Sequence, residues 1–138
     1  MSKLHSPPFR LGLLDLLLWA CPLSLFSSPL FSSLSHQHHQ FHHYNPGKSE
    51  FGEERYFKIT KRIYGELDAR LKDSKFLAGH DYTIADIATW PWMARHEWHD
   101  IGLKNYKNLS RWYLEISERE AVVKGYAFMD KEAKIPKP

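Results

Sequence analysis

The chain has 138 residues, of which 43% are hydrophobic and 25% are charged, the composition of one globular domain with a hydrophobic core. Its net charge of +3 is small and mixed in sign along the chain, which argues against a nucleic-acid-binding protein. The single cysteine, Cys21, excludes an internal disulfide and a cysteine-based metal site, and it is typical of proteins from a reducing compartment such as the cytoplasm.

Residues 1–35 differ in composition from the rest of the chain. Only Lys3, Arg10 and Asp15 are charged there, and the later part alternates Ser, Leu, Phe and Pro without a helical or strand period. Three interpretations remain open: a secretory signal, a poorly ordered leader, or a damaged or mis-spliced reading frame. The apolar run is interrupted by Asp15 and is too short to span a membrane. We therefore treat 1–35 as an atypical leader before a domain at 36–130.

Five of the nine histidines lie between His36 and Tyr44. Imidazole is a ready ligand for transition metals, but this tract has no carboxylate or cysteine close to it. We expect a solvated loop that ends at Asn45-Pro46-Gly47, and we predict no metal site.

Apolar residues recur at steps of three and four between Ser49 and Asp73, which predicts a long amphipathic helix. The stripe that should face the core contains Tyr56, Ile59, Ile63, Leu67 and Leu71, and a second stripe contains Phe57 and Tyr64. Opposite charges four residues apart predict the ion pairs Glu54–Lys58 and Asp68–Lys72 on the solvent face.

The next helix has the clearest local signal in the chain. After the turn Gly79-His-Asp81, Thr83 stands three residues before Asp86, which is the spacing of a capping box. Tyr82 and Ile87 flank the cap at the positions of a hydrophobic staple. The following residues are almost all apolar, so we expect this helix to be buried, with a structural role for these four residues.

Further along, Asp100-Ile-Gly102 breaks the chain, and a helix should begin near Asn108, a residue suited to the N-cap. Its inward face should contain Leu109, Trp112, Tyr113 and Ile116. A short helical piece is expected at 121–126, followed by a loose polar tail at 131–138. The sequence contains no strand pattern, phosphate-binding glycine loop, zinc spacing or nucleophile motif. It therefore predicts an all-α bundle.

Several motifs occur in a recognisable order: Glu54-Arg-Tyr56, Phe76-Leu-Ala-Gly79, Asp81-Tyr-Thr-Ile-Ala-Asp-Ile-Ala88, Trp90-Pro-Trp92 and Asn108-Leu-Ser-Arg-Trp112. With this order, about residues 38–126 resemble the carboxy-terminal helical domain of glutathione transferases. The likeness is greatest to the nu-class branch, relatives of the fungal nitrogen-catabolite prion protein that act as glutathione-dependent disulfide-bond reductases. The resemblance implies a glutathione transferase C-terminal-like helical bundle, with the family's thioredoxin-like N-terminal domain missing.

The resemblance also implies one binding residue. In the nu-class branch the arginine of the Glu-Arg-Tyr motif reaches a glutathione carboxylate, typically across a dimer interface, and this position is Arg55. A guanidinium suits that task because its planar donors can bind both carboxylate oxygens. The alternative is an exposed arginine that pairs within its own helix. No catalytic residue carries over, because the group that activates the thiol belongs to the thioredoxin-like domain.

These observations predict a glutathione transferase-like protein in a truncated form that lacks the main glutathione site, with glutathione as cosubstrate if it is active. The alternative is a non-catalytic helical interaction module, because such domains also occur in translation factors and aminoacyl-tRNA synthetases. The expected partners are glutathione or a thioredoxin-like domain, with a homodimer as a further alternative. Neither nucleic acid nor a membrane is expected.

Overall fold

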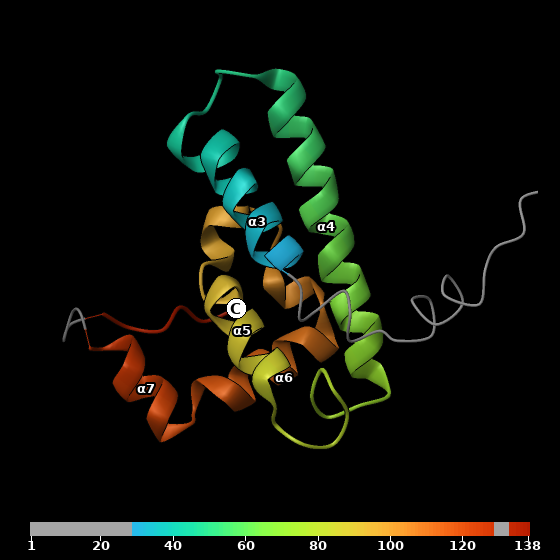
Figure 1. The fold of residues 1–138 in the computed structure, drawn as a ribbon, viewed down its shortest axis with the longest axis vertical. Coiled ribbons are helices and arrows are strands. Elements are labelled where there is room, and N and C mark those ends of the chain that lie inside the picture. The colour runs from blue at the N-terminus through green and yellow to red at the C-terminus, as the bar shows by residue number, and fades with distance from the viewer. Residues whose placement is uncertain (1–28, 129–132) are drawn as a thin grey trace, which may run out of the picture.

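The computed structural model describes residues 29–128 and 133–138, and within them it contains helices and no β-strand (Figure 1). Helix α3 (Pro29–His38) continues directly into a π-helix, η1 (His39–Tyr44), and both run beside the long helix α4 (Glu50–Lys72). The remaining elements are α5 (Ile84–Met93), the 3-10 helices η2 (His96–His99) and η3 (Leu103–Asn105), α6 (Lys107–Ser117) and α7 (Glu120–Tyr126). The predicted all-α fold class is confirmed.

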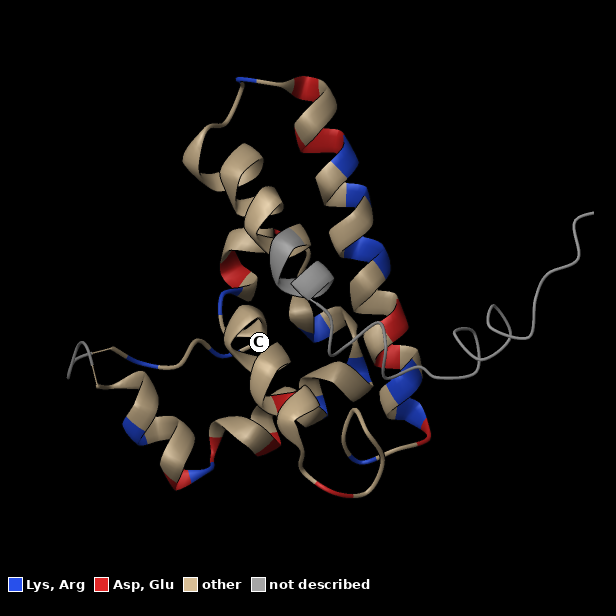
Figure 2. Ribbon diagram, viewed as in Figure 1, with Lys and Arg blue, Asp and Glu red and all other residues tan. Residues whose placement is uncertain are grey.

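Helix α4 has the boundaries that the sequence predicted. Ser49 is its N-cap and accepts a hydrogen bond from the Gly52 N–H at 3.1 Å, and Asp73 is its C-cap. Charged residues occur along the length of this helix (Figure 2), including the predicted pair of Glu54 and Lys58. The inner face contributes large side chains to the core: Ile63, Tyr64, Leu67 and Leu71.

Asp68 does not pair with Lys72 as the sequence predicted. Its Oδ1 instead accepts hydrogen bonds from the backbone N–H groups of Asn108 at 2.8 Å and Leu109 at 2.9 Å. The first N–H groups of a helix have no partner inside the helix, and a negative charge there faces the positive end of its dipole. The cap of α6 therefore comes from α4, and Asn108, expected to be that cap, donates to it.

Arg111 of α6 binds the C-terminal end of α4 and the turn that follows it. Its Nη2 donates to the carbonyl oxygens of Leu71 at 2.9 Å and Ser74 at 3.1 Å, and its Nη1 donates to that of Lys75 at 3.3 Å. The last carbonyls of a helix lack partners inside the helix and attract positive charge. Helices α4 and α6 therefore cap each other.

Helix α5 begins at a capping box. The Thr83 N–H donates to Asp86 Oδ2 at 3.0 Å, and the Ala85 N–H donates to Thr83 Oγ1 at 3.3 Å. Asp86 is buried, and its Oδ1 also accepts from the Leu77 N–H at 3.0 Å and from Trp112 Nε1 at 2.7 Å. One carboxylate thus connects the start of α5, the turn before it and α6.

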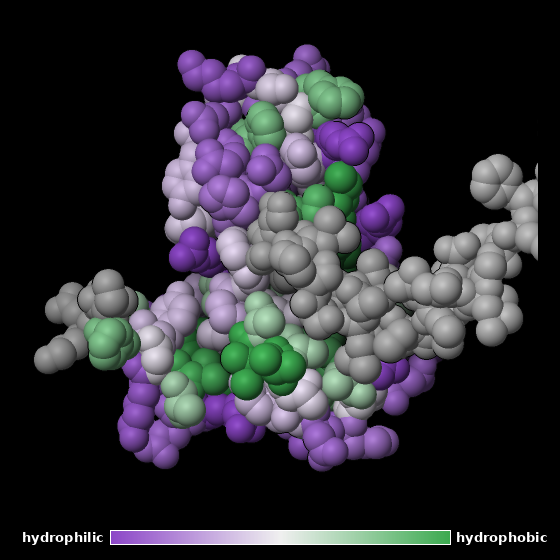
Figure 3. All heavy atoms as spheres, viewed as in Figure 1, coloured by the Kyte–Doolittle hydropathy of each residue, from purple (hydrophilic) through white to green (hydrophobic). Residues whose placement is uncertain are grey.

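The expectation that α5 is buried all round is wrong. Its inner face lies in the core, but Ile84 and Ile87 are 77% and 54% exposed. Figure 3 shows hydrophobic side chains gathered on the surface around the start of α5. The apolar character of a side chain does not by itself mean that the side chain is buried within its own chain. This helix therefore presents an apolar outer face.

Described residues on both sides of the expected domain at 36–130 also belong to the bundle or contact it. Helix α3 begins at Pro29, so the boundary drawn at residue 35 lies inside a helix, while residues 1–28 lie outside the described part. At the other end, residues 133–138 contact the bundle instead of forming a loose tail. The Tyr113 hydroxyl donates to the Pro136 carbonyl at 2.8 Å, and Ile135 packs against the core.

Candidate functional site

The histidine-rich segment is packed into the bundle, which corrects the expectation of a solvated loop. His38 and His39 are buried and meet His99 of η2, which is also buried. The rings of His39 and His99 are stacked with centroids 4.7 Å apart, and the His38 ring stands edge-on to His99 at 5.4 Å. The Tyr64 hydroxyl lies 2.7 Å from His99 Nδ1. We call His38, His39 and His99 the histidine cluster.

Burial sets the protonation state of this cluster. Burial is the largest cause and neighbouring histidines add to it, so that together they lower the pKa of His39 to about 4 and that of His99 to about 2. Burial also lowers the pKa of His38. Burial raises the pKa of Tyr64, so its hydroxyl keeps its proton beside His99 Nδ1. The three imidazoles are therefore neutral at pH 7.

Within the described residues, no three His, Cys, Asp or Glu side chains are arranged to hold a metal ion. His42 follows His38 by one helical turn, and its Nε2 lies 3.8 Å from an Asp100 carboxylate oxygen. His43 is stacked on Trp98, with ring centroids 4.4 Å apart. These histidines pack against aromatic rings and one surface carboxylate.

Arg55 is exposed on α4 and directly precedes Tyr56, which packs against η1. The Tyr56 ring is stacked on Phe41 of η1 with centroids 5.3 Å apart and planes 7° apart. No ion pair found within residues 29–128 and 133–138 includes the Arg55 guanidinium. The Arg55 side chain is thus exposed, and its role stays a prediction.

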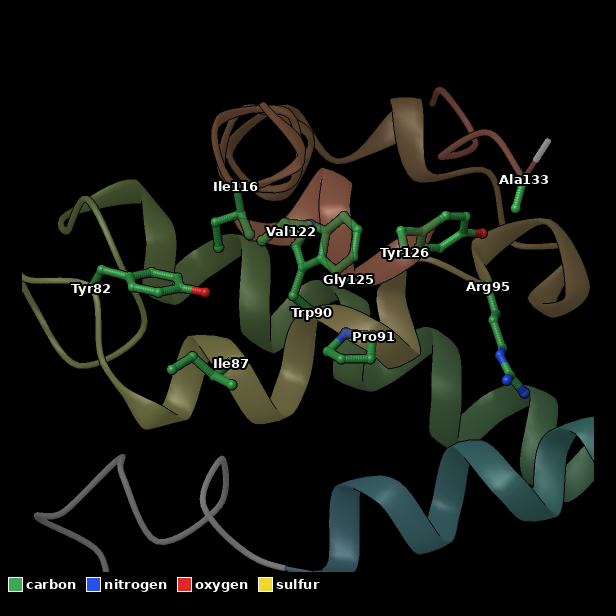
Figure 4. Close-up of a pocket in the computed structure, with 10 residues that line it drawn as sticks. All are labelled: Tyr82, Ile87, Trp90, Pro91, Arg95, Ile116, Val122, Gly125, Tyr126 and Ala133. Carbon is green, nitrogen blue, oxygen red and sulfur yellow. The ribbon is translucent and has the colours of Figure 1, made fainter. Parts of the chain in front are cut away.

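A pocket of about 540 Å³ opens beside α5, between that helix and α7 (Figure 4). Arg95 lies at one end, with its guanidinium directed away from the Trp90 ring and its Cζ 5.0 Å from the centroid of Trp98. The other lining is mostly apolar and comes from Tyr82, Ile87, Trp90, Pro91, Ile116, Val122, Gly125, Tyr126 and Ala133. This pocket continues the apolar outer face of α5.

The two residues expected to form the staple, Tyr82 and Ile87, both line this pocket. The Tyr82 ring also contacts Phe76, with centroids 5.7 Å apart, and Arg119, whose Cζ lies 3.9 Å from its centroid. Ile87 remains half exposed. The two side chains thus form part of a surface as well as flanking the cap.

The tryptophans of α5 belong to the core, as the sequence indicated. Trp90 is buried and donates from Nε1 to the Tyr113 carbonyl at 3.1 Å, and Trp92 packs against the core. Sequence reasoning missed His99 as part of a buried cluster, since no local motif marks it. No helix in the described part of the chain combines the length and apolar character needed to cross a bilayer.

The family model described as glutathione S-transferase, C-terminal domain, matches residues 24–120. The disulfide-bond oxidoreductase YghU of Escherichia coli (strain K12) is 40% identical over 94 residues, which cover 62% of this chain and 32% of the relative. The disulfide-bond oxidoreductase YfcG of the same bacterium is 39% identical over 85 residues, which cover 62% of this chain and 40% of the relative. The chain thus spans well under half the length of either relative.

Two crystal structures share the fold. A glutathione transferase from Burkholderia graminis, with two glutathione molecules bound per subunit, has a TM-score of 0.67 and 24% identity, and the match covers 81% of this chain and 48% of that one. YghU from Streptococcus pneumoniae, complexed with glutathione, has a TM-score of 0.59 and 27% identity, and the match covers 89% and 55%. The motif order, the bundle and the family match agree. This chain belongs to the glutathione S-transferase C-terminal domain family.

Proposed function

We propose that this chain is the helical domain of a glutathione-dependent disulfide-bond oxidoreductase. The observation that carries the proposal is its 40% and 39% identity to two disulfide-bond oxidoreductases. The glutathione bound in two proteins of the same fold supports it. Thiol–disulfide exchange with glutathione belongs to a reducing compartment, and the single cysteine of the chain fits a cytoplasmic location.

In this proposal Arg55 binds a carboxylate of glutathione. The stack of Tyr56 on Phe41 fixes the backbone beside Arg55, while the guanidinium itself is exposed. A planar guanidinium can donate to both oxygens of a carboxylate, which a lysine ammonium cannot do with the same geometry. Arg55 contributes binding and no chemistry, because the resemblance assigns activation of the thiol to a thioredoxin-like domain.

The apolar outer face of α5 is the proposed contact for that thioredoxin-like domain. Ile84, Ile87 and the pocket beside them form an exposed apolar surface in this chain. Contiguous apolar surface of this kind marks interaction sites in soluble proteins. The matched segment covers only 32% and 40% of the two relatives, so each relative has enough further residues to contain such a domain. The helical domain then supplies a half-site for glutathione, and the partner supplies the rest.

The first test is calorimetric titration of the purified chain with glutathione at millimolar concentration. We expect the Arg55→Ala variant to bind at least about ten-fold more weakly, a change of about 1.4 kcal/mol. The glutathione affinity of Arg55→Lys should lie between those of Arg55→Ala and the unchanged chain, because lysine keeps the charge and loses the planar donor pair.

Lys61→Ala is the matched control, since Lys61 is a second exposed cation on α4. It should leave the affinity unchanged. Equal affinity in the unchanged chain and Arg55→Ala would remove the proposed role of Arg55. Absence of any glutathione binding would favour the second candidate, a non-catalytic helical interaction module. The exposed apolar face of α5 is the observation that favours this alternative, since it fits a protein partner without requiring glutathione.

A further inference from the structure

The contact between the histidine segment and the bundle has an unusual composition. The described residues contain eight buried side-chain polar atoms without a hydrogen-bond partner, and four of these are imidazole nitrogens of the histidine cluster. The cluster is held by ring packing: His38 also contacts Phe57 at 6.1 Å between centroids, and His39 contacts Trp98 at 5.3 Å. Such packing requires neutral imidazoles, because a buried charge without a partner is costly.

We propose that the histidine cluster makes residues 29–44, helices α3 and η1, a pH-dependent lock. At neutral pH the segment is docked on α4 and η2, and mild acid releases it while α4, α5 and α6 remain folded. This release does not depend on glutathione binding. It would change the surroundings of Tyr56, because the Phe41 ring stacked on Tyr56 belongs to the released segment.

The surrounding groups do not stabilise a protonated cluster. Among the described residues, the ion pair found for a histidine of this segment is that of His42 with Asp100, at 3.8 Å, and the Asp100 side chain is 83% exposed. Arg95 acts against a positive charge on His39, and the backbone carbonyls of Tyr56 and His99 only partly offset the burial of His38. Other titratable groups near the cluster come from its own segment and from the two elements it contacts: His36, His42 and His43; Tyr56 and Tyr64 on α4; and His96 and Glu97 on η2. From α5 the cluster meets Trp92, which carries no charge.

The pH range follows from the difference between docked and released states. A released imidazole regains an ordinary pKa of about 6.5, whereas a docked one keeps its low pKa. Each such histidine then favours release by up to about ten-fold for each pH unit below about 6.5, so three together give up to about a thousand-fold. Docking is therefore fully stable above about pH 6.5 and weakens steadily below it. Release does not require the pH to reach the low pKa values of the docked histidines.

Hydrogen exchange of the whole chain between pH 7.5 and 5.5 tests the lock. Protection factors, which correct for the intrinsic pH dependence of exchange, are compared between η1 and the buried turns of α6. From pH 6.5 to 5.5 we expect the protection of η1 amides to fall by at least about thirty-fold, while that of α6 changes by less than about ten-fold. Protection that is constant in η1, or that falls equally in both helices, would overturn the proposal.

His39→Phe tests the titrating group, because phenylalanine keeps an aromatic ring in the stack and carries no proton to gain. It should reduce the pH dependence of η1 protection by up to about ten-fold per pH unit. His80→Gln is the control, since His80 is exposed in the turn before α5 and should leave the dependence unchanged. An unchanged dependence in a folded His39→Phe variant contradicts the lock. If that variant does not fold, the comparison of η1 with α6 in the unchanged chain still decides.

Discussion

Asp86 caps the start of its own helix and also forms hydrogen bonds with residues far from it in the chain. Its spacing from Thr83 indicates a capping box, and the box is present. The same buried carboxylate also binds the Leu77 N–H and the indole N–H of Trp112, which lies 26 residues further along the chain. Local spacing can identify a cap, but it contains no information about a partner on another helix. The sequence therefore indicated the first pair of bonds and missed the second.

Asp86→Ala should destabilise the domain by about 3–5 kcal/mol, because it removes a buried carboxylate and leaves the donors of Leu77 and Trp112 unpaired. Urea unfolding measures the change. Thr83→Ala, which removes only the cap oxygen, should cost about 1 kcal/mol. The exposed Asp81 is the control, and Asp81→Ala should change stability by less than about 0.5 kcal/mol. A loss below about 1 kcal/mol for Asp86→Ala would show that the long-range bonds contribute little.

Among the elements, those whose signal is periodic could be predicted closely. The limits of α4 and the inward face of α6 follow from spacings of three and four residues, which depend only on nearby residues. The burial of His38 and His39 could not be predicted in this way, because imidazole suits both solvent and interior and its partner His99 lies on a distant element. Arg55 was found only through the resemblance, since nothing local separates it from the other exposed cations of α4.

Two glycines of α4 provide a matched test of packing between elements. A Cβ at Gly52 would lie 2.8 Å from the nearest Phe41 ring carbon, whereas a Cβ at the exposed Gly65 would meet nothing within 4 Å. Gly65→Ala should stabilise the domain by about 0.5–1 kcal/mol through helix propensity. Gly52→Ala gains the same propensity but displaces Phe41, and we expect a net loss of about 1–2 kcal/mol.

Thermal unfolding of the two glycine variants measures both changes in one experiment. The two melting temperatures should move in opposite directions from that of the unchanged chain. Equal stabilisation by both substitutions would mean that the Phe41 ring can move aside without cost, and that η1 is loosely packed on α4.

For the molecule as a whole, the sequence could not predict which apolar residues are covered. The periodicity of α5 correctly marks its inner face, but Ile84 and Ile87 extend the apolar character to the outside. Apolar spacing does not distinguish a core within one chain from a surface that another domain covers. The pocket was missed for a related reason, since it is lined from α5, α6, α7 and the segments around them.

Ile87→Glu places a charge on this outer face and should reduce self-association of the purified chain without lowering its melting temperature by more than a few degrees. Sedimentation velocity over a range of protein concentrations measures the association. Leu114→Glu is the control, because Leu114 is an exposed apolar residue of α6 outside the pocket lining. Self-association that falls equally with both variants would indicate a general effect of added charge and would count against a specific surface on α5.

The mutual capping of α4 and α6 has a consequence for the order of folding. Asp68 supplies the missing acceptor at the start of α6, and Arg111 supplies a donor for the Leu71 carbonyl near the end of α4, across about forty residues of chain. Neither helix end is complete until the other helix is in place, so an isolated peptide of either helix should fray at that end. The intervening chain, which includes α5, is closed into a loop when the two helices meet. Folding of these three helices is therefore expected to be a single cooperative step, with the entropy of closing that loop in its barrier.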